Sequence, residues 1–321
     1  MRKITILSLL ALALSWTACQ KNSTEPLTQE EDFNSIMLQA FDDEVGFMAD
    51  RGFGLDSVDA VFTLSWGRMS LPRLPFKINT GQAMAIALPQ DQDVRFYGGG
   101  LDMGEVVLNT PSDPIVLTAF QGFNGGTVYT SFPKPGKGVK DNRRRGSGPF
   151  SRFNFNSLEF TPNALYTFDV GGSDEFPAMQ VSMTTPASLL SLESINNGQA
   201  LDSTADLTIQ WKGGDAGDHV LVALLAFAAP NGRPGFANGE KPNPEDMRLV
   251  FGNRPILVKV LDQNEGTITL AAEEWTAILD NFDARSVMVH VAAINDRRET
   301  VAGREIAKII RLQDRAIVDL Q

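Results

Sequence analysis

Cysteine and histidine are almost absent from this chain of 321 residues, which has one cysteine and two histidines. A disulfide framework needs paired cysteines, and Cys/His zinc sites need several such ligands. The sequence therefore excludes both kinds of site, and it predicts no cofactor. Histidine is also the usual general base at neutral pH, so the chain offers few candidates for that role.

Positive charge is scarce as well, because 28 Lys and Arg residues stand against 39 Asp and Glu residues. The net charge of −11 excludes a general nucleic-acid-binding protein, since phosphate contacts need a basic face. Long apolar runs are missing from the rest of the chain after the amino-terminal segment. The longest one there covers residues 220–229. A membrane-spanning helix takes roughly 20 apolar residues, so this run fits a buried strand better. An apolar content of 43% is typical of a folded globular chain.

The amino terminus has the pattern of an export signal. Arg2 and Lys3 supply positive charge, and residues 4–14 form an apolar run broken only by Thr5 and Ser8. A run of this length is too short to cross a bilayer, and it is typical of the apolar region of a signal peptide. The segment Trp16-Thr17-Ala18-Cys19 follows at once, and it contains the only cysteine of the chain.

Small residues before a cysteine in this context resemble the lipobox of bacterial lipoproteins, although Trp16 stands where Leu, Val or Ile is usual. The resemblance implies that the Cys19 thiol carries a diacylglyceryl group and that the signal peptide, residues 1–18, is removed. The expected partner of the anchor is a membrane, and the expected location is the cell envelope. Gln20 and Lys21 offer no aspartate that would retain the protein at the inner membrane, which favours the outer membrane. A secreted protein without lipid and an uncleaved anchor are the alternatives.

Residues 19–55 are predicted to form a tether and an acidic amphipathic segment. Apolar residues within it recur at spacings of three and four, as in a helix that packs on a following domain.

From residue 56 onward the apolar period changes to two, which is typical of strands covered on one side. Glycine pairs and triplets separate the candidate strands, and short strands with glycine turns favour a sandwich or barrel. The candidate strands before Pro186 are residues 60–66, 84–88, 105–109, 115–120, 127–132, 165–170 and 179–184.

Thr185-Pro186 is predicted to end a first β-sandwich domain, residues 56–186, because proline cannot join a strand ladder. A second β-sandwich domain is predicted over residues 187–321, with one short helical turn at residues 272–279. Its candidate strands are residues 189–192, 205–211, 220–229, 256–261, 267–270, 286–294 and 306–312. This pattern resembles an immunoglobulin-like or fibronectin-like sandwich, and the whole chain resembles secreted bacterial lipoproteins of this build. The predicted fold class is all-β, with two sandwiches in tandem.

No catalytic or metal site emerges from the residue pattern. His219 lies at the start of an apolar strand and His290 lies between two valines, so both are interpreted as structural residues. Asp91-Gln92-Asp93 begins like an EF-hand loop, but Arg95 occupies the next ligand position. The sequence therefore predicts a protein that is not an enzyme.

One basic stretch stands against the acidic background, between Pro133 and Pro149. Its glycine and proline content indicates a long solvated loop. The alternative is a docking loop for anionic envelope glycans or lipid headgroups, because flexible cations bind phosphate and carboxylate groups. The cations of this basic loop are Lys134, Lys137, Lys140, Arg143, Arg144 and Arg145.

The sequence thus favours a lipid-anchored envelope protein with a non-catalytic binding or structural role. The alternative is a glycan-binding module or a carboxylate-based polysaccharide-processing protein. In that alternative Trp66, Trp211 and Trp275 would stack on sugar rings, although tryptophans in alternating strands usually belong to a core.

Overall fold

The computed structural model describes residues 58–70, 77–89, 100–121, 126–131, 158–227, 255–279 and 286–321. These residues form strands and one helix, α4 (Ala272–Leu279), so the predicted all-β class is confirmed. The predicted signal peptide, residues 1–18, and the predicted tether, residues 19–55, lie outside the described residues.

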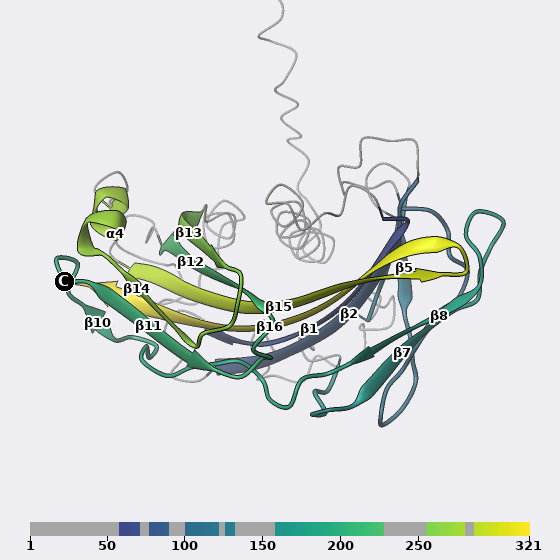
Figure 1. The fold of residues 1–321 in the computed structure, drawn as a ribbon, viewed down its shortest axis with the longest axis horizontal. Coiled ribbons are helices and arrows are strands. Elements are labelled where there is room, and N and C mark those ends of the chain that lie inside the picture. The colour runs from purple at the N-terminus through teal and green to yellow at the C-terminus, as the bar shows by residue number, and fades with distance from the viewer. Residues whose placement is uncertain are drawn as a thin grey trace, which may run out of the picture. The chain divides into compact units, whose positions relative to one another are not determined.

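The largest sheet joins strands from both ends of the chain, and β1, β2, β15 and β16 run side by side in it (Figure 1). Within it, β1 pairs in parallel with β16, while its other neighbour β2 is antiparallel. In sheet order its strands are β13 (Pro255–Leu261), β12 (His219–Phe227), β15 (Ser286–Val301), β16 (Arg304–Leu320), β1 (Ala60–Ser70), β2 (Lys77–Ala87), β6 (Thr127–Thr130) and β5 (Thr118–Gln121), and β10 (Ala200–Leu201) pairs with β16 beside this path.

Two smaller sheets accompany the large one. The four-stranded sheet has the order β4 (Ile115–Val116), β3 (Val106–Asn109), β7 (Leu165–Val170) and β8 (Met179–Thr184). The three-stranded sheet has the order β14 (Thr267–Leu270), β11 (Leu207–Lys212) and β9 (Ser191–Leu192). Strands β8 and β11 alternate strictly between buried and exposed residues, as expected for strands that are covered on one face.

The main core lies between the inner face of the large sheet and the two smaller sheets. Phe62 and Trp66 point from β1 into this layer, where they meet Phe168 and Tyr166 of β7. The ring centroids lie 5.1 Å apart for Phe62 and Phe168 and 5.3 Å apart for Trp66 and Tyr166, both in edge-to-face geometry. Such contacts add to the gain from burying the rings, so this layer fixes the stacking of the sheets. The predicted sandwich packing is confirmed.

The opposite, outer face of the large sheet holds a second buried cluster. It is made of the residues that alternate with those of the main core, such as Val61 between Ala60 and Phe62. The members of this outer cluster are Val58, Val61, Ile86, Leu88, Leu221, Ala223, Ala292, Ile294, Ala307 and Ile309. The large sheet is therefore buried on both faces, which explains the continuous apolar runs in β12 and β15.

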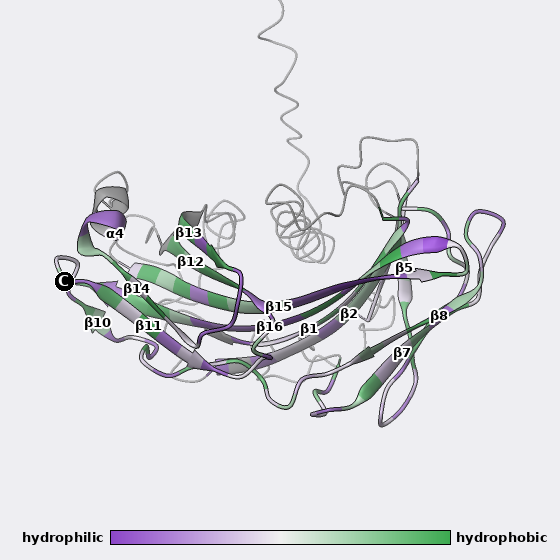
Figure 2. Ribbon diagram, in the orientation of Figure 1, coloured by the Kyte–Doolittle hydropathy of each residue, from purple (hydrophilic) through white to green (hydrophobic). Residues whose placement is uncertain are grey.

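The hairpin of β15 and β16 is much longer than its apolar residues predicted. Strand β15 turns from apolar to polar along its length (Figure 2), and its polar part, residues 295–300, remains paired with β16. Ala302 and Gly303 close the hairpin with φ angles of 50° and 76°. Two successive positive φ angles are typical of a tight two-residue hairpin turn. The exposed polar residues belong to the strand because their main chain stays paired with β16, whose residues there include the buried Ile306 and Ile310.

The predicted division between residues 186 and 187 does not separate two independent sandwiches. Strand β8 does end at Thr184, as predicted, but the large sheet contains strands from both sides of this point. Strand β1 pairs with β16 over nine residues, from Ala60 with Ile306 to Arg68 with Asp314. Local apolar patterns carry no information about such a distant parallel pairing, so the sequence could not predict it. Both segments share one sheet and one main core.

Candidate functional site

The site residues predicted from sequence fall outside the part of the chain that the structure describes. This holds for the lipidation site Cys19 and for all cations of the basic loop, Lys134, Lys137, Lys140, Arg143, Arg144 and Arg145. Their roles remain predictions. The structure brings other polar groups together. They are buried carboxylates and cations, which lie either between the sheets or on the outer face of the large sheet.

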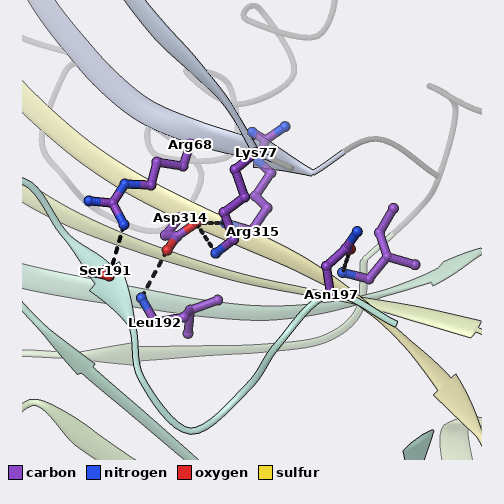
Figure 3. A network of polar contacts seen from close by, with 8 residues as sticks. Arg68, Lys77, Ser191, Leu192, Asn197, Asp314 and Arg315 are labelled. Atoms are coloured by element: carbon purple, nitrogen blue, oxygen red, sulfur yellow. Dashed lines mark hydrogen bonds and ion pairs between the residues drawn. The ribbon is translucent and has the colours of Figure 1, made fainter. Parts of the chain in front are cut away.

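The most deeply buried of these groups is Asp314 of β16, whose side chain is fully inaccessible to solvent. Lys77 of β2 donates a hydrogen bond from Nζ to its Oδ1 at 2.6 Å. The main-chain N–H of Leu192, in β9, donates to its Oδ2 at 2.9 Å. Figure 3 shows the carboxylate between these two donors, with the main-chain N–H of Arg315 as a third at 2.8 Å. We call this set of contacts the Asp314 junction.

The Asp314 junction connects the large sheet with the three-stranded sheet. Asp314 stands on the inner face of β16, between the core residues Leu312 and Ala316, because side chains alternate along the strand. Beside it, Arg68 of β1 donates to the hydroxyl of Ser191 in β9 at 3.1 Å (Figure 3). A buried carboxylate is stable only when its oxygens accept hydrogen bonds, and here strands from both layers supply them.

A second polar cluster lies on the outer face of the large sheet. His290 of β15 and Arg311 of β16 are both buried, and Arg311 Nη2 lies 3.5 Å from His290 Nε2. Arg311 and Arg315 each donate to Oε1 of Gln313, at 2.9 and 3.0 Å. His290 is thus a residue of the sheet face, as the sequence predicted, and it lies beside Arg311.

Two further buried polar groups stabilise loops. The hydroxyl of Tyr129 donates to Oδ1 of Asp102 at 2.5 Å and accepts from the main-chain N–H of Met103 at 3.0 Å. Burial, and then the hydrogen bond to Asp102, raise the pKa of Tyr129 to about 12. The same hydrogen bond, with one from the N–H of Gly104, holds the pKa of Asp102 below its usual value.

Asp218 precedes β12 and is also buried. It accepts from Nδ2 of Asn295 at 2.8 Å and from the main-chain N–H of Asp215 at 2.7 Å. Burial raises the pKa of this carboxyl group above its usual value. His219 follows at the start of β12, where its Nε2 lies 3.7 Å from a carboxylate oxygen of Asp296. These contacts fix the loop between β11 and β12.

The tryptophans that the glycan alternative depended on are core residues. Trp66, Trp211 and Trp275 are 1%, 3% and 1% exposed. Each indole N–H has an acceptor within the fold, namely Leu158 O, Asn264 Oδ1 and Ala205 O. A sugar ring stacks only on an accessible aromatic face, so these three residues form no sugar-binding platform.

The polar groups described above have one structural role in common: their hydrogen bonds join strands or close loops of the fold. Sequence reasoning missed Asp314, Asp102 and Asp218, because single aspartates among 39 acidic residues carry no local signal. Within the described ranges, no group of three metal-ligating side chains comes together. In the same ranges, no helix has the length and apolar character needed to cross a membrane.

The chain has distant structural likenesses to known proteins. No protein-family model matches the chain, and no curated protein matches it. The FN1–FN3 domains of chicken CNTN1 are similar over 80% of this chain and 68% of that one, with 8% identity and a TM-score of 0.20. The alpha-2-macroglobulin of E. coli is similar over 72% of this chain and 13% of that one, with 12% identity and a TM-score of 0.17. Both TM-scores are low, so the fold class rests on the strands described above.

The Asp314 junction predicts a clear effect of Asp314→Asn on stability. The variant keeps the shape of the side chain but removes the charge that pairs with Lys77, and it places an amide donor where donors already converge. We expect urea unfolding to show a loss of about 2 kcal/mol, as for a hydrogen-bonded charged group inside a protein. Glu193→Gln is the control, because it breaks the exposed pair of Glu193 with Lys212 and should cost less than about 1 kcal/mol. Equal losses in the two variants would contradict the role of the junction.

The raised pKa of Tyr129 predicts a loss of stability at high pH. Below pH 10 the phenol is protonated in both the folded and the unfolded chain. Between about pH 10 and 12 the unfolded chain releases this proton while the folded chain retains it, so the free energy of unfolding falls as the pH rises. Urea unfolding across this range should show a shallower fall for Tyr129→Phe than for the unmodified protein. The same slope in both proteins would show that Tyr129 retains an ordinary pKa.

Proposed function

We propose that this protein is a lipid-anchored component of the bacterial cell envelope with a non-catalytic binding or structural role. The observation that carries the proposal is the position of the only cysteine, Cys19, directly after a cationic start and a short apolar run. Two or three acyl chains at this residue would hold the protein stably on a membrane, whereas a single chain binds only weakly.

The described fold supports a scaffold role beyond the anchor. Its buried Asp314 joins strands of different sheets. Trp66, Trp211 and Trp275 are buried in the core. A sandwich stabilised in this way presents its loops at fixed positions, which is the usual arrangement of binding modules.

The partner that fits the chain's charge is an anionic component of the envelope. The basic loop concentrates six cations within a chain whose net charge is −11. Lipid headgroups and acidic envelope glycans share phosphate or carboxylate groups, and arginine binds both in a bidentate manner. The outer membrane is the proposed location, because Gln20 and Lys21 follow the cysteine in place of the aspartate that retains lipoproteins at the inner membrane.

The anchor is tested by metabolic labelling with a palmitate analogue. The unmodified chain should carry the label, whereas Cys19→Ser should lack it and retain residues 1–18, because cleavage depends on the modified cysteine. Gln20→Asp is the matched control, because it leaves Cys19 intact. It should carry the label but move to the inner membrane in bacteria that use aspartate as a retention signal. An unlabelled wild-type protein would refute the lipid anchor.

The basic loop is tested by retention on an immobilised polyanion such as heparin. Replacing Arg143, Arg144 and Arg145 with alanine should lower the salt concentration that elutes the detergent-solubilised protein, because fewer cations contact the polyanion. A control variant with alanine at Lys212, Arg297 and Arg298 removes the same charge from exposed strand positions. It should elute like the unmodified protein. Identical elution of the loop variant and the unmodified protein would refute a docking role of the loop.

A further inference from the structure

Strand β8, Met179–Thr184, forms one edge of the four-stranded sheet. Among the described residues it pairs with β7 alone, over its whole length from Leu165 with Thr184 to Val170 with Met179. The side chains of Gln180, Ser182 and Thr184 are exposed, while those between them point into the main core. The strand therefore has one paired side, one buried face and one exposed face.

The ladder shows which main-chain groups of β8 face away from β7. Thr185 donates its N–H to the carbonyl of Ala164 at 2.9 Å, and hydrogen-bonded pairs recur at every second residue of an antiparallel ladder. Residues 179, 181 and 183 therefore bond to β7. The pairing of β7 with β3 agrees, because Gly171 donates to Glu105 on the other side of β7.

Residues 180, 182 and 184 consequently direct their N–H and C=O groups outward. Within the described part of the chain, no hydrogen bond reaches these main-chain groups. An edge of this kind is a template for a further strand.

The edge also lacks the features with which proteins usually prevent strand addition. Such features are charged residues, proline, bulges or a very short edge strand. Strand β8 has six residues without charge or proline. By contrast, β4 at the opposite edge of the same sheet has two residues, and the edge strand β13 of the large sheet contains Pro255 and Lys259.

We propose that β8 pairs in antiparallel fashion with β8 of a second copy of this chain, about a two-fold axis at Ser182. Only outward-facing residues can exchange main-chain hydrogen bonds across the new interface. The register with the most hydrogen-bonded pairs places Ser182 opposite Ser182 of the second copy and Gln180 opposite Thr184. Such an interface uses the same patch on both chains and closes the edge, so no further copies add.

The side chains are complementary in this register. Val181 of each chain stands opposite Met183 of the other on the core side, so apolar residues meet apolar residues. On the exposed face the polar Gln180 meets the polar Thr184. In the adjoining strands, Asp169 is the neighbour of Gln180 and the 59% exposed Leu165 is the neighbour of Thr184, so no like charges face each other along this row. A partner strand with charged side chains would place them opposite the uncharged side chains of β8 without forming ion pairs. The uncharged β8 of a second copy is therefore the favoured partner.

The expected association is weak. Met179, Val181 and Met183 are already buried in the single chain, so the new interface gains main-chain hydrogen bonds and little apolar burial. Small interfaces of this kind are transient. A test must therefore trap the pair, and cysteine cross-linking of the full detergent-solubilised chain does so.

The experiment introduces Ser182→Cys or Gln180→Cys, both at exposed positions, and oxidises the protein with diamide. Opposite residues of a hydrogen-bonded antiparallel pair have Cα atoms about 5.5 Å apart, within the range of a disulfide. The two copies of residue 180 are offset by four residues, or roughly 14 Å, which is too far. We expect Ser182→Cys to form a disulfide-linked dimer and Gln180→Cys to remain monomeric.

A mixture of Gln180→Cys with Thr184→Cys tests the register, because these two positions face each other across the proposed axis. The mixture should cross-link although neither variant does so alone. The unmodified chain, treated in parallel, reports any cross-link through Cys19. Equal cross-linking of the two single variants, a monomeric Ser182→Cys, or a cross-link to a different protein would each overturn the proposal.

Discussion

The carboxylate of Asp314 is the contact on which the arrangement of the layers depends. It lies on the inner face of the last strand, β16, and it accepts hydrogen bonds from Lys77 in the large sheet and from Leu192 in the three-stranded sheet. Apolar side chains attract the sheets to each other without fixing a direction, because burial is not directional. A charged group inside the core tolerates only positions that keep its donors in place. The junction therefore fixes how the small sheet is placed over the large one, while ring contacts such as Phe62 with Phe168 fill the layer beside it.

The two faces of the large sheet differ in how they accommodate polar groups. The inner face carries Asp314 within an apolar core, whereas the outer face carries His290 beside Arg311, and Arg311 and Arg315 both donate to Gln313. Because side chains alternate along β16, residues 311 to 315 serve the two faces in turn. This alternation explains why one short stretch of a strand can carry an aspartate and two arginines without placing them on the same face.

Much of the local structure could be predicted from sequence, and most of the tertiary structure could not. Strands β7, β8 and β14 and helix α4 have the bounds that their alternation and periodicity predicted. The hairpin of β15 and β16 was underestimated, because residues 295–300 are polar and Ala302-Gly303 lacks the Asn-Gly pattern of a tight turn. The parallel pairing of β1 with β16 and the Asp314 junction depend on residues more than 100 positions apart, and no local pattern reports such contacts. The predicted lipid anchor and basic loop lie outside the described residues.

The pairing of β1 with β16 also governs when folding can finish. Strand β1 begins at Ala60 and pairs with residues 306–314 of β16, so the centre of the large sheet stays open until synthesis has passed those residues. Closing so long a loop carries an entropic cost before the contact is gained, and folds dominated by distant contacts form slowly. During this delay the apolar residues of β1 are without their neighbour, and the nascent chain needs protection from aggregation.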